Sequence, residues 1–561
     1  MTSIHENLET IPGLFYNWEK TTPNKVFLRQ PIGDTWKTYT FKEVGEQARR
    51  LVSAMRGMGL AKGDHVALIS KNCAHWIISD IALMMGGYVS VPLYASLAAD
   101  QLALVLEKSD AKGVIVGKLD EWEKKSKGLI DGIKVMRFPQ YKGAATVTQG
   151  TAWEDLMKNE PMEGYPEPEI DSLWTILFTS GTTGTPKGVM HTYKNAALLN
   201  NNEKINNIMG TLASGQNTRL FSFLPLNHIA ERAAVEMSGI SSGGTISFAD
   251  TLDTFAKNLA ETRPTFFFAV PRIWTKFQLG VLSKMPQKKL DMLLKIPIVS
   301  GIIKKKLLKA LGLDAATTCL TGASITPESL KQWYRKLGLN LREVYGMTEN
   351  AGGFTMMPAN QHKPNTVGKP LPNAEGRIDP DTGEILMKMP WMMTGYYKEP
   401  ELTADNLVDG WLHTGDKGKI DDEGFLKIVG RVKDAFKTTK GKFIVPTIIE
   451  DHFSDNNLIE QVCVAGLGIP QPVALVCLSE IGMKEDKTKV TENLQSEIGR
   501  INKQLHNHER ISTIVVASEP WSPENQLLTP TLKIRRGAIN ETYGEKIGNW
   551  HEAKDKVIWE A

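Results

Sequence analysis

The sequence predicts an α/β fold with a large N-terminal domain of mostly parallel sheets flanked by helices, followed by a small C-terminal α/β domain. The chain has 561 residues, which is more than one hydrophobic core usually supports. Strand-like and helical runs alternate along its first part, as they do in parallel sheets covered by helices. A polar, turn-rich stretch from 415 to 428 then separates the bulk of the chain from about 130 further residues, enough for one small domain.

Each of the first elements follows from its apolar spacing. Phe41–Met58 and Trp76–Met85 have helical spacing, whereas His65–Ser70 and Tyr88–Pro92 are short apolar runs typical of buried strands. Ligands of such sheets bind where the strands end. We therefore place an N-terminal domain at residues 1–430 and a C-terminal domain at 431–561, with the boundary near Gly430.

Charge and cysteine usage exclude several classes of protein. A net charge of +3 gives no argument for nucleic-acid binding. The four cysteines lie far apart in the sequence, so we expect neither disulfides nor a zinc site, and we expect a reducing, cytoplasmic compartment. Met1–Trp18 carries two glutamates and no apolar run, so no signal peptide is expected, and Ile77–Leu93 holds Asp80 and is interpreted as buried helix and strand.

One loop carries the strongest functional signal. The apolar run Leu173–Phe178 predicts a buried strand, and a segment rich in glycine, threonine and serine follows it directly. Glycines let a backbone approach a polyphosphate, amides and hydroxyls donate to it, and a lysine offsets its charge. The residues that we assign to this task are Thr179, Ser180, Gly181, Thr182, Thr183, Gly184 and Lys187. The flanking Pro186 and Gly188 distinguish the loop from a Walker A motif, and its place after a strand disfavours a plain linker.

Further motifs follow in order along the chain. They are Leu224–Arg232, Thr321–Ser324, Tyr345–Glu349, His413–Asp416, Gly430–Lys437 with Gly441 and Pro446, and Leu528–Lys533. Together with the loop, their order and spacing resemble the acyl-adenylate-forming (AMP-binding) superfamily, which includes acyl-CoA synthetases, luciferases and peptide-synthetase adenylation domains. The blocks at 63–66, 91–94, 270–272 and 437–442 look closest to long-chain fatty acyl-CoA synthetases.

The resemblance implies a two-step reaction with ATP, Mg²⁺ and CoA, in which a fatty acid forms an acyl adenylate and pyrophosphate leaves. Two anions must then approach, so positive charge and oriented donors dominate catalysis. Lys187 and the loop hydroxyls suit the β- and γ-phosphates. Glu349 and Thr182 suit Mg²⁺, which prefers hard oxygen ligands, and Thr348 suits the α-phosphate.

The same resemblance assigns the nucleoside and the second domain. Tyr345 offers a face for adenine, the backbone of Gly322, Ala323, Ser324 and Gly346 runs near the base, and Asp416 accepts the ribose hydroxyls. Ile428 and Arg431 complete the nucleotide site. Lys533 is expected to bridge the carboxylate and the α-phosphate, Lys433 to lie at a hinge near 431–434 that makes the C-terminal domain mobile, and Gly441 to line a pantetheine tunnel.

The acyl site is less determined. His228 is expected to act there, at the start of a helix, and Phe266–Phe268 and Trp274 either line an apolar tunnel or belong to the core. Leu293–Leu313 carries five lysines among apolar residues, which fits either peripheral contact with the inner face of a membrane or an ordinary surface helix. Chain length and oligomeric state are not predicted.

Two rival functions stay open at this stage. One is an enzyme that adenylates an acyl or aryl acid and uses another acceptor, such as a carrier protein. The other is a non-catalytic nucleotide- or lipid-binding homologue, against which the retention of all the charged motif residues argues.

Overall fold

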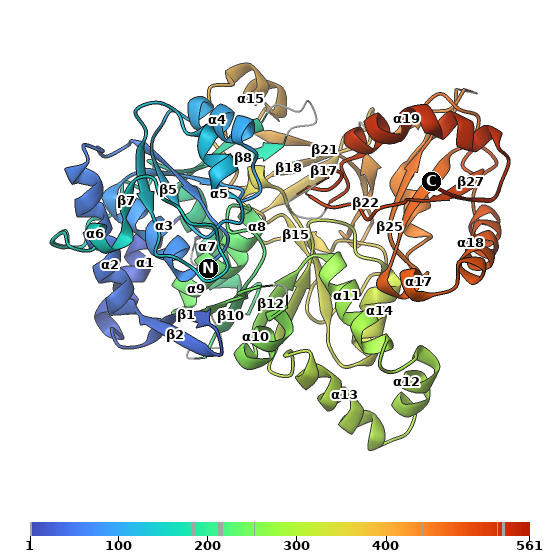
Figure 1. The fold of residues 1–561 in the computed structure, drawn as a ribbon, viewed down its shortest axis with the longest axis horizontal. Coiled ribbons are helices and arrows are strands. Elements are labelled where there is room, and N and C mark those ends of the chain that lie inside the picture. Colours follow the sequence, from blue (N-terminus) through green and yellow to red (C-terminus); the bar gives the residue numbers. More distant parts are fainter. Residues whose placement is uncertain are drawn as a thin grey trace.

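The N-terminal part of the protein is built around an eight-stranded sheet (Figure 1). The computed structural model describes residues 3–560 apart from 181–185, 211–216, 252, 433, 440, 524 and 530–532. The strand order is β19-β9-β8-β4-β3-β5-β6-β7. The strands are β3 (His65–Ile69), β4 (Val89–Leu93), β5 (Ala111–Val116), β6 (Lys134–Arg137), β7 (Thr151–Ala152), β8 (Leu173–Ser180), β9 (Pro186–Thr192) and β19 (Gly395–Tyr396).

The centre of this sheet is parallel, as the sequence predicts. β3 pairs with β4 and β5 in parallel, and β4 continues to β8, whereas β9 and β19 add antiparallel strands at one edge. Helix α2 (Phe41–Gly57) begins at a capping box in which Thr40 and Glu43 satisfy each other's backbone amides. Helix α3 (Ala74–Gly86) is buried along its whole length, which explains its apolar sequence without a membrane.

Three further sheets complete the N-terminal domain. The first has the order β12-β13-β14-β15-β16, the second β17-β18-β21-β20 with β22 on β21, and the third β10-β11-β1-β2. Their strands are β12 (Phe266–Ala269), β13 (Thr318–Thr321), β14 (Leu341–Tyr345), β15 (Thr355–Met356), β16 (Lys369–Pro370), β17 (Glu375–Ile378), β18 (Glu384–Lys388), β20 (Leu407–Val408), β21 (Trp411–Ile420), β22 (Leu426–Arg431), β10 (Arg219–Ser222), β11 (Thr245–Phe248), β1 (Val26–Ile32) and β2 (Thr35–Thr40).

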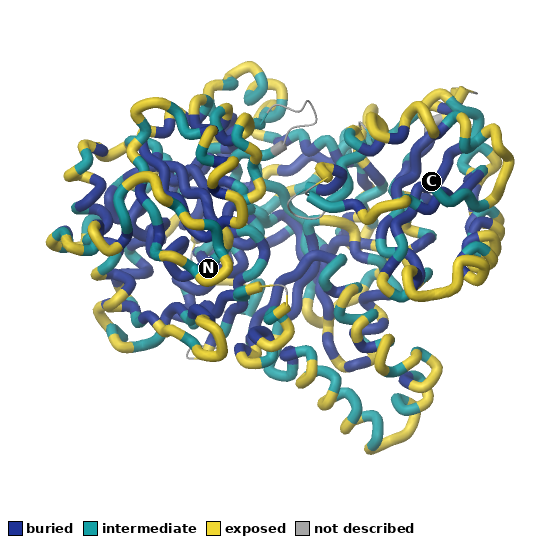
Figure 2. The backbone as a smooth tube through the Cα atoms, viewed as in Figure 1, coloured by how far each residue is buried: buried dark blue, intermediate teal, exposed yellow. Residues whose placement is uncertain are grey.

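The smaller C-terminal domain lies beside this body, in orange and red in Figure 1. Its sheet has the order β25-β26-β27-β28, with β25 (Ile459–Ala465), β26 (Val473–Leu478), β27 (Thr513–Val516) and β28 (Val557–Trp559). Helices α18 (Lys487–Asn502) and α19 (Arg536–Glu552) cover it. Its two apolar cores contain residues from 444 onward only, and the burial map separates them from the larger core (Figure 2). The exact boundary near 430 stays a prediction.

The stretch from 415 to 428 differs from the turn-rich segment expected from its composition. Most of it belongs to strands β21 and β22, joined by a short turn in which the Asp421 carboxylate accepts backbone amides from Glu423 and Phe425. Residues along β21 alternate between buried and half-buried. The buried positions are taken by threonine, aspartate and glycine as well as leucine, so the period-two pattern is invisible to hydrophobicity alone.

Candidate active site

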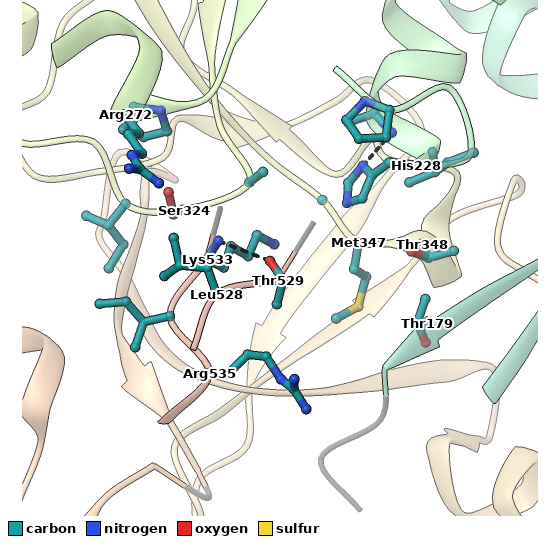
Figure 3. A pocket seen from close by; sticks show the side chains of 18 of the residues that line it. Thr179, His228, Arg272, Ser324, Met347, Thr348, Leu528, Thr529, Lys533 and Arg535 are labelled. Carbon is teal, nitrogen blue, oxygen red and sulfur yellow. Dashed lines mark hydrogen bonds between the residues drawn. The ribbon is translucent and has the colours of Figure 1, made fainter. Parts of the chain in front are cut away.

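The two domains enclose one large cleft of about 3500 Å³, and nearly all the assigned site residues that the structure describes line it. The expected phosphate-loop residues Gly181, Thr182, Thr183 and Gly184, together with Lys433, lie outside the described residues, as does the side chain of Ser180. Thr179 is the last residue but one of β8 and Lys187 is the second residue of β9. These two residues are paired in the antiparallel register, and both line the cleft. Figure 3 shows Thr179 and Thr348 on the same side of it.

Glu349 and Lys187 are connected through a tyrosine that the sequence analysis did not single out. The hydroxyl of Tyr396 donates to Glu349 Oε1 over 2.9 Å, and Lys187 Nζ lies 5.7 Å from the centre of the Tyr396 ring. Burial, followed by the charge of Glu349, raises the pKa of Tyr396 well above its ordinary value, so its hydroxyl stays a donor. Tyr396 is on β19, far from both partners in sequence, and no motif marked it.

A buried histidine supports the neighbouring residue. Thr348 and Glu349 lie in a short 3₁₀ turn, Thr348–Asn350. His191 Nε2 is 2.7 Å from the Thr348 carbonyl oxygen. Burial lowers the pKa of His191 to about 4, so the ring is neutral and Nε2 must carry the hydrogen that it donates. Among the described residues, Nδ1 of the same ring has no hydrogen-bond partner.

The expected nucleoside residues converge from three elements. Tyr345 ends β14, and its hydroxyl donates to Asp416 Oδ2 over 2.6 Å, while Arg431 Nε lies 3.1 Å from Asp416 Oδ1. Asp416 and Arg431 are direct register partners on β21 and β22. Each carboxylate oxygen therefore has one protein partner already, but it keeps a second lone pair for a ribose hydroxyl. Ile428 lies on the same strand as Arg431 and also lines the cleft.

The Gly322–Ser324 segment follows β13 in a constrained shape. A side chain at Gly322 would meet the Val344 carbonyl oxygen at 2.7 Å, and one at Gly346 would meet the Gly352 carbonyl oxygen at 2.3 Å, so both positions need glycine. Ala323 adopts φ +67°, a left-handed conformation that is uncommon for alanine. The segment thus keeps a fixed backbone path beside the cleft. Backbone strain such as that at Ala323 often marks a binding site.

Lys533 extends from the C-terminal domain into the same cleft (Figure 3). The backbone amide of Lys533 donates to Thr529 Oγ1 over 3.0 Å, which holds this part of the chain in place. Burial lowers the pKa of Lys533 to about 8; the charge of Arg431 acts in the same direction and that of Asp416 opposes it. Lys533 lines the cleft together with the Asp416–Arg431 pair in this domain arrangement.

His228 faces the same lysine and caps helix α8 (Ile229–Glu231). Its Nδ1 accepts from the Ala230 amide over 3.2 Å, so Nε2 carries the ring hydrogen. Burial, and then the charge of Lys533, lowers the pKa of His228 to about 3. The ring is therefore a neutral N–H donor at the cleft and a poor base, which narrows the catalytic role expected from the sequence to donating a hydrogen bond.

The helix after His228 presents small residues to the cleft. A π-helical turn, Arg232–Met237, joins α8 to α9 (Ser238–Ser242). Its widened backbone is the kind of distortion found at functional sites. The cleft-lining positions recur at helical spacing: Ala230, Ala233, Ala234, Met237, Ser238 and Ser241. The opposite side is fixed by Arg232, which is fully buried and paired with Asp80 and Glu236.

Gly441 does not line the cleft in this arrangement, and most of the aromatic residues whose role the sequence left open belong to the core. Gly441 adopts φ +72° with no atom within 4 Å of its Cβ position and does not line the cleft, so the structure does not bring it to the other site residues. Phe266, Phe267 and Trp274 are core residues, and the Trp274 indole N–H is bonded to backbone carbonyls; of this group only Phe268 lines the cleft.

An ion pair between the domains was not anticipated. Arg272 is on α11 (Pro271–Leu282), and its Nε donates to Glu460 Oε1 on β25 over 2.8 Å. Both side chains are largely buried, at 21% and 17% exposed. Arg272 belongs to a block noted in the sequence, but nothing in the sequence indicates Glu460 as its partner.

Comparison with known proteins identifies the family. The model of the AMP-binding enzyme family matches residues 15–397, and that of the AMP-binding enzyme C-terminal domain matches 433–555. The chain therefore belongs to the AMP-binding enzyme family.

Curated relatives match over nearly the whole chain. A long-chain-fatty-acid–CoA ligase of Mycobacterium bovis is 26% identical, covering 97% of this chain and 96% of the relative. Long-chain-fatty-acid–CoA ligase 5 of Mus musculus is 30% identical, with 92% and 85% covered. The adenylation domain of a Mycobacterium chelonae carboxylate reductase has a TM-score of 0.80 at 21% identity, covering 98% of this chain and 92% of that domain, which shows the same fold.

Proposed function

We propose that this protein activates a medium- or long-chain fatty acid as an acyl adenylate and transfers the acyl group to CoA. The main support is the meeting of Lys533 with Asp416, Arg431 and His228 in one cleft, although these residues come from distant parts of the chain and from two domains. The relatives named long-chain-fatty-acid–CoA ligases favour a fatty acid and CoA over an aryl acid or a carrier protein.

The charge of each site residue suits it to a different part of the substrates. Lys187 offsets the outer phosphates of ATP, and the Lys533 ammonium stabilises the charge that develops as the carboxylate oxygen attacks the α-phosphorus and pyrophosphate leaves. Asp416 and Tyr345 hold the nucleoside. Glu349, a hard oxygen donor oriented by Tyr396, would hold a Mg²⁺ ion, which would offset the charge of the phosphates. The thioester step of this proposal requires a mobile C-terminal domain, a hinge at Lys433 and a pantetheine tunnel lined by Gly441. The expected cytoplasmic location stays a prediction.

The acyl chain is assigned to the small-residue face of the helix from Ala230 to Ser241. Alanine and serine leave room beside a backbone that is anchored on its far side by the Arg232 ion pairs.

In the described part of the chain, no helix is long and apolar enough to cross a membrane.

The test separates the two half-reactions. Pyrophosphate release is measured with ATP and Mg²⁺ over fatty acids of increasing length and benzoate, with and without CoA. We expect CoA-stimulated turnover that peaks with medium or long chains. The Lys533→Ala variant should lose adenylation by at least about a hundredfold, the scale of one lost transition-state contact, yet form thioester from supplied acyl adenylate. Equal loss of both steps would contradict the role of Lys533, and turnover of benzoate alone would contradict the fatty-acid assignment.

A further inference from the structure

Two helices form an arm that extends away from the cleft. α12 (Gln287–Leu294) and α13 (Val299–Ala310) project from the body beyond α11 and α14 (Glu328–Lys336), at the bottom of Figure 1. Among their residues only Leu290 is buried, and Figure 2 shows the arm almost entirely exposed or half-buried. The arm lies outside the chemistry proposed above.

The tip of the arm exposes isoleucine. Ile298 is 83% exposed and Ile296 is 44% exposed. Ile298 adopts φ +68° and ψ −57°, and the Val299 amide donates to the Pro297 carbonyl over 2.7 Å. This is the rarer, strained form of the γ-turn, and a β-branched residue is an unusual occupant. The turn thus directs an apolar side chain into solvent at the junction of the two helices.

Strong positive charge surrounds this tip. Between 284 and 310 the sequence has a single acid, Asp291, and eight lysines: Lys284, Lys288, Lys289, Lys295, Lys304, Lys305, Lys306 and Lys309. Asp291 accepts from Gln287 Nε2 one turn earlier on α12, and it lies 3.9 Å from Lys336 Nζ on α14. In the described part of the chain, none of the eight lysines is paired with a carboxylate.

On the outer side of each helix in the arm, apolar and basic side chains lie about one turn apart. On α13 the inner positions Ile303, Leu307 and Leu308 pack against the domain core. Ile302, which is 62% exposed, lies one turn before Lys305 and Lys306 on the outside. On α12, Met292 is 57% exposed and stands one turn after Lys288 and Lys289. An ordinary surface helix turns charge alone outward, whereas this face mixes charge with large apolar side chains.

We propose that the α12–α13 arm docks on an anionic lipid surface. The apolar set, Met292, Ile296, Ile298 and Ile302, would enter the boundary between headgroups and acyl chains, and the lysines would contact lipid phosphates. Charge of one sign over the whole face favours a polyanionic surface over a second copy of this basic arm. α11, which leads into the arm, supplies Ile273 and Phe277 to the cleft wall, so one helix connects the arm with the cleft. The inference does not depend on the reaction that the cleft performs.

Vesicle flotation of the full-length protein tests this. Vesicles of phosphatidylcholine with rising fractions of phosphatidylglycerol are used at low and at physiological salt. We expect binding that increases with phosphatidylglycerol and weakens with salt. Lys305→Gln/Lys306→Gln/Lys309→Gln should weaken partitioning at least tenfold, whereas the equally charged control Lys127→Gln/Lys484→Gln/Lys503→Gln should not. Ile298→Ser should weaken it several-fold, in contrast to Met483→Ser at another exposed apolar position.

Each other outcome overturns the proposal. No binding at any composition, equal binding to neutral vesicles, or equal losses in the arm and control variants would exclude a lipid-docking arm. A concentration-dependent dimer in sedimentation, lost in the arm variants, would assign the face to a second copy instead. Unchanged pyrophosphate release from soluble short-chain acids or, if the protein is inactive, unchanged thermal melting would show that the variants are folded.

Discussion

The surroundings of Lys533 set the pKa of its side chain. Burial lowers its pKa to about 8, and the adjacent Arg431 adds to this effect, while Asp416 keeps the protonated form accessible. A buried ammonium is weakly solvated, so it interacts strongly with an incoming anion. The ATP phosphates would raise this pKa again on binding.

A pH profile follows from this shift. The protonated form of Lys533 is the one that stabilises the developing negative charge, and it is lost as pH rises through about 8 in the free enzyme. We therefore expect kcat/KM for adenylation to fall above that pH. Lys533→Arg, whose guanidinium has a much higher pKa and stays protonated over this range, should be slower but should lack this decline. An unchanged alkaline decline in Lys533→Arg would assign it to another group.

His191 gives a second prediction at this scale. His191→Phe keeps a ring but removes the donor to the Thr348 carbonyl, at a cost of about 1–3 kcal/mol for an unsatisfied buried acceptor. Because that carbonyl precedes Glu349, we expect a severalfold higher KM for ATP and a higher Mg²⁺ requirement. His191→Gln, which retains a donor, should recover most of both. A lower melting temperature with unchanged KM and Mg²⁺ dependence would reduce His191 to a structural role.

The sequence identifies these residues unequally. Lys533, Asp416 and Glu349 stand in recognisable motifs, so their meeting in one cleft could be anticipated. Tyr396 and Glu460 could not, because each acquires its place only through a contact with a residue far away in sequence. Short motifs contain the residues that contact a ligand, whereas the side chains that support those residues can lie anywhere in the sequence.

At the scale of elements, apolar spacing predicts helices and strands well where one face is buried. The helix predicted at Phe41–Met58 is α2, and the strand predicted at His65–Ser70 is β3. The prediction is wrong for 415–428, where strands β21 and β22 bury threonine, aspartate and glycine. One of these buried polar residues is Asp416, which we assign to the nucleotide, and the Thr414 hydroxyl on the same strand accepts from its amide.

The small-residue helix makes the next prediction. Ala233→Leu adds three carbons to the face that we assign to the acyl chain. We expect the preferred acid to become shorter, with activity on long acids falling at least tenfold and activity on short acids retained. Ala553→Leu, at an exposed position of the C-terminal domain, is the matched control. A uniform loss over all chain lengths would indicate misfolding of the helix rather than a blocked acyl site.

At the scale of the whole molecule, the described arrangement joins the domains through the Arg272–Glu460 ion pair while Lys533 occupies the cleft. Any rotation of the C-terminal domain must break this pair. The pair therefore stabilises the arrangement in which Lys533 lies in the cleft, which we assign to adenylation.

Its removal should act on one half-reaction. For Glu460→Gln we expect adenylation to slow about two- to tenfold, consistent with the loss of a partly buried pair, and thioester formation from supplied acyl adenylate to be unaffected or faster. Glu497→Gln removes a pair with Arg500 inside the C-terminal domain and serves as the control. Equal slowing of both steps by Glu460→Gln would contradict a role in domain arrangement.

The pairing of Asp416 with Arg431 has a practical consequence for chimaeras. The strand that carries Asp416 is hydrogen-bonded to the strand that leads into the C-terminal domain, and the two residues lie opposite each other. A graft of a foreign C-terminal domain should therefore be joined after Arg431. A junction placed earlier would replace one strand of this β-ladder along with the domain, and the foreign strand would then be mismatched with Asp416 at the proposed nucleotide site.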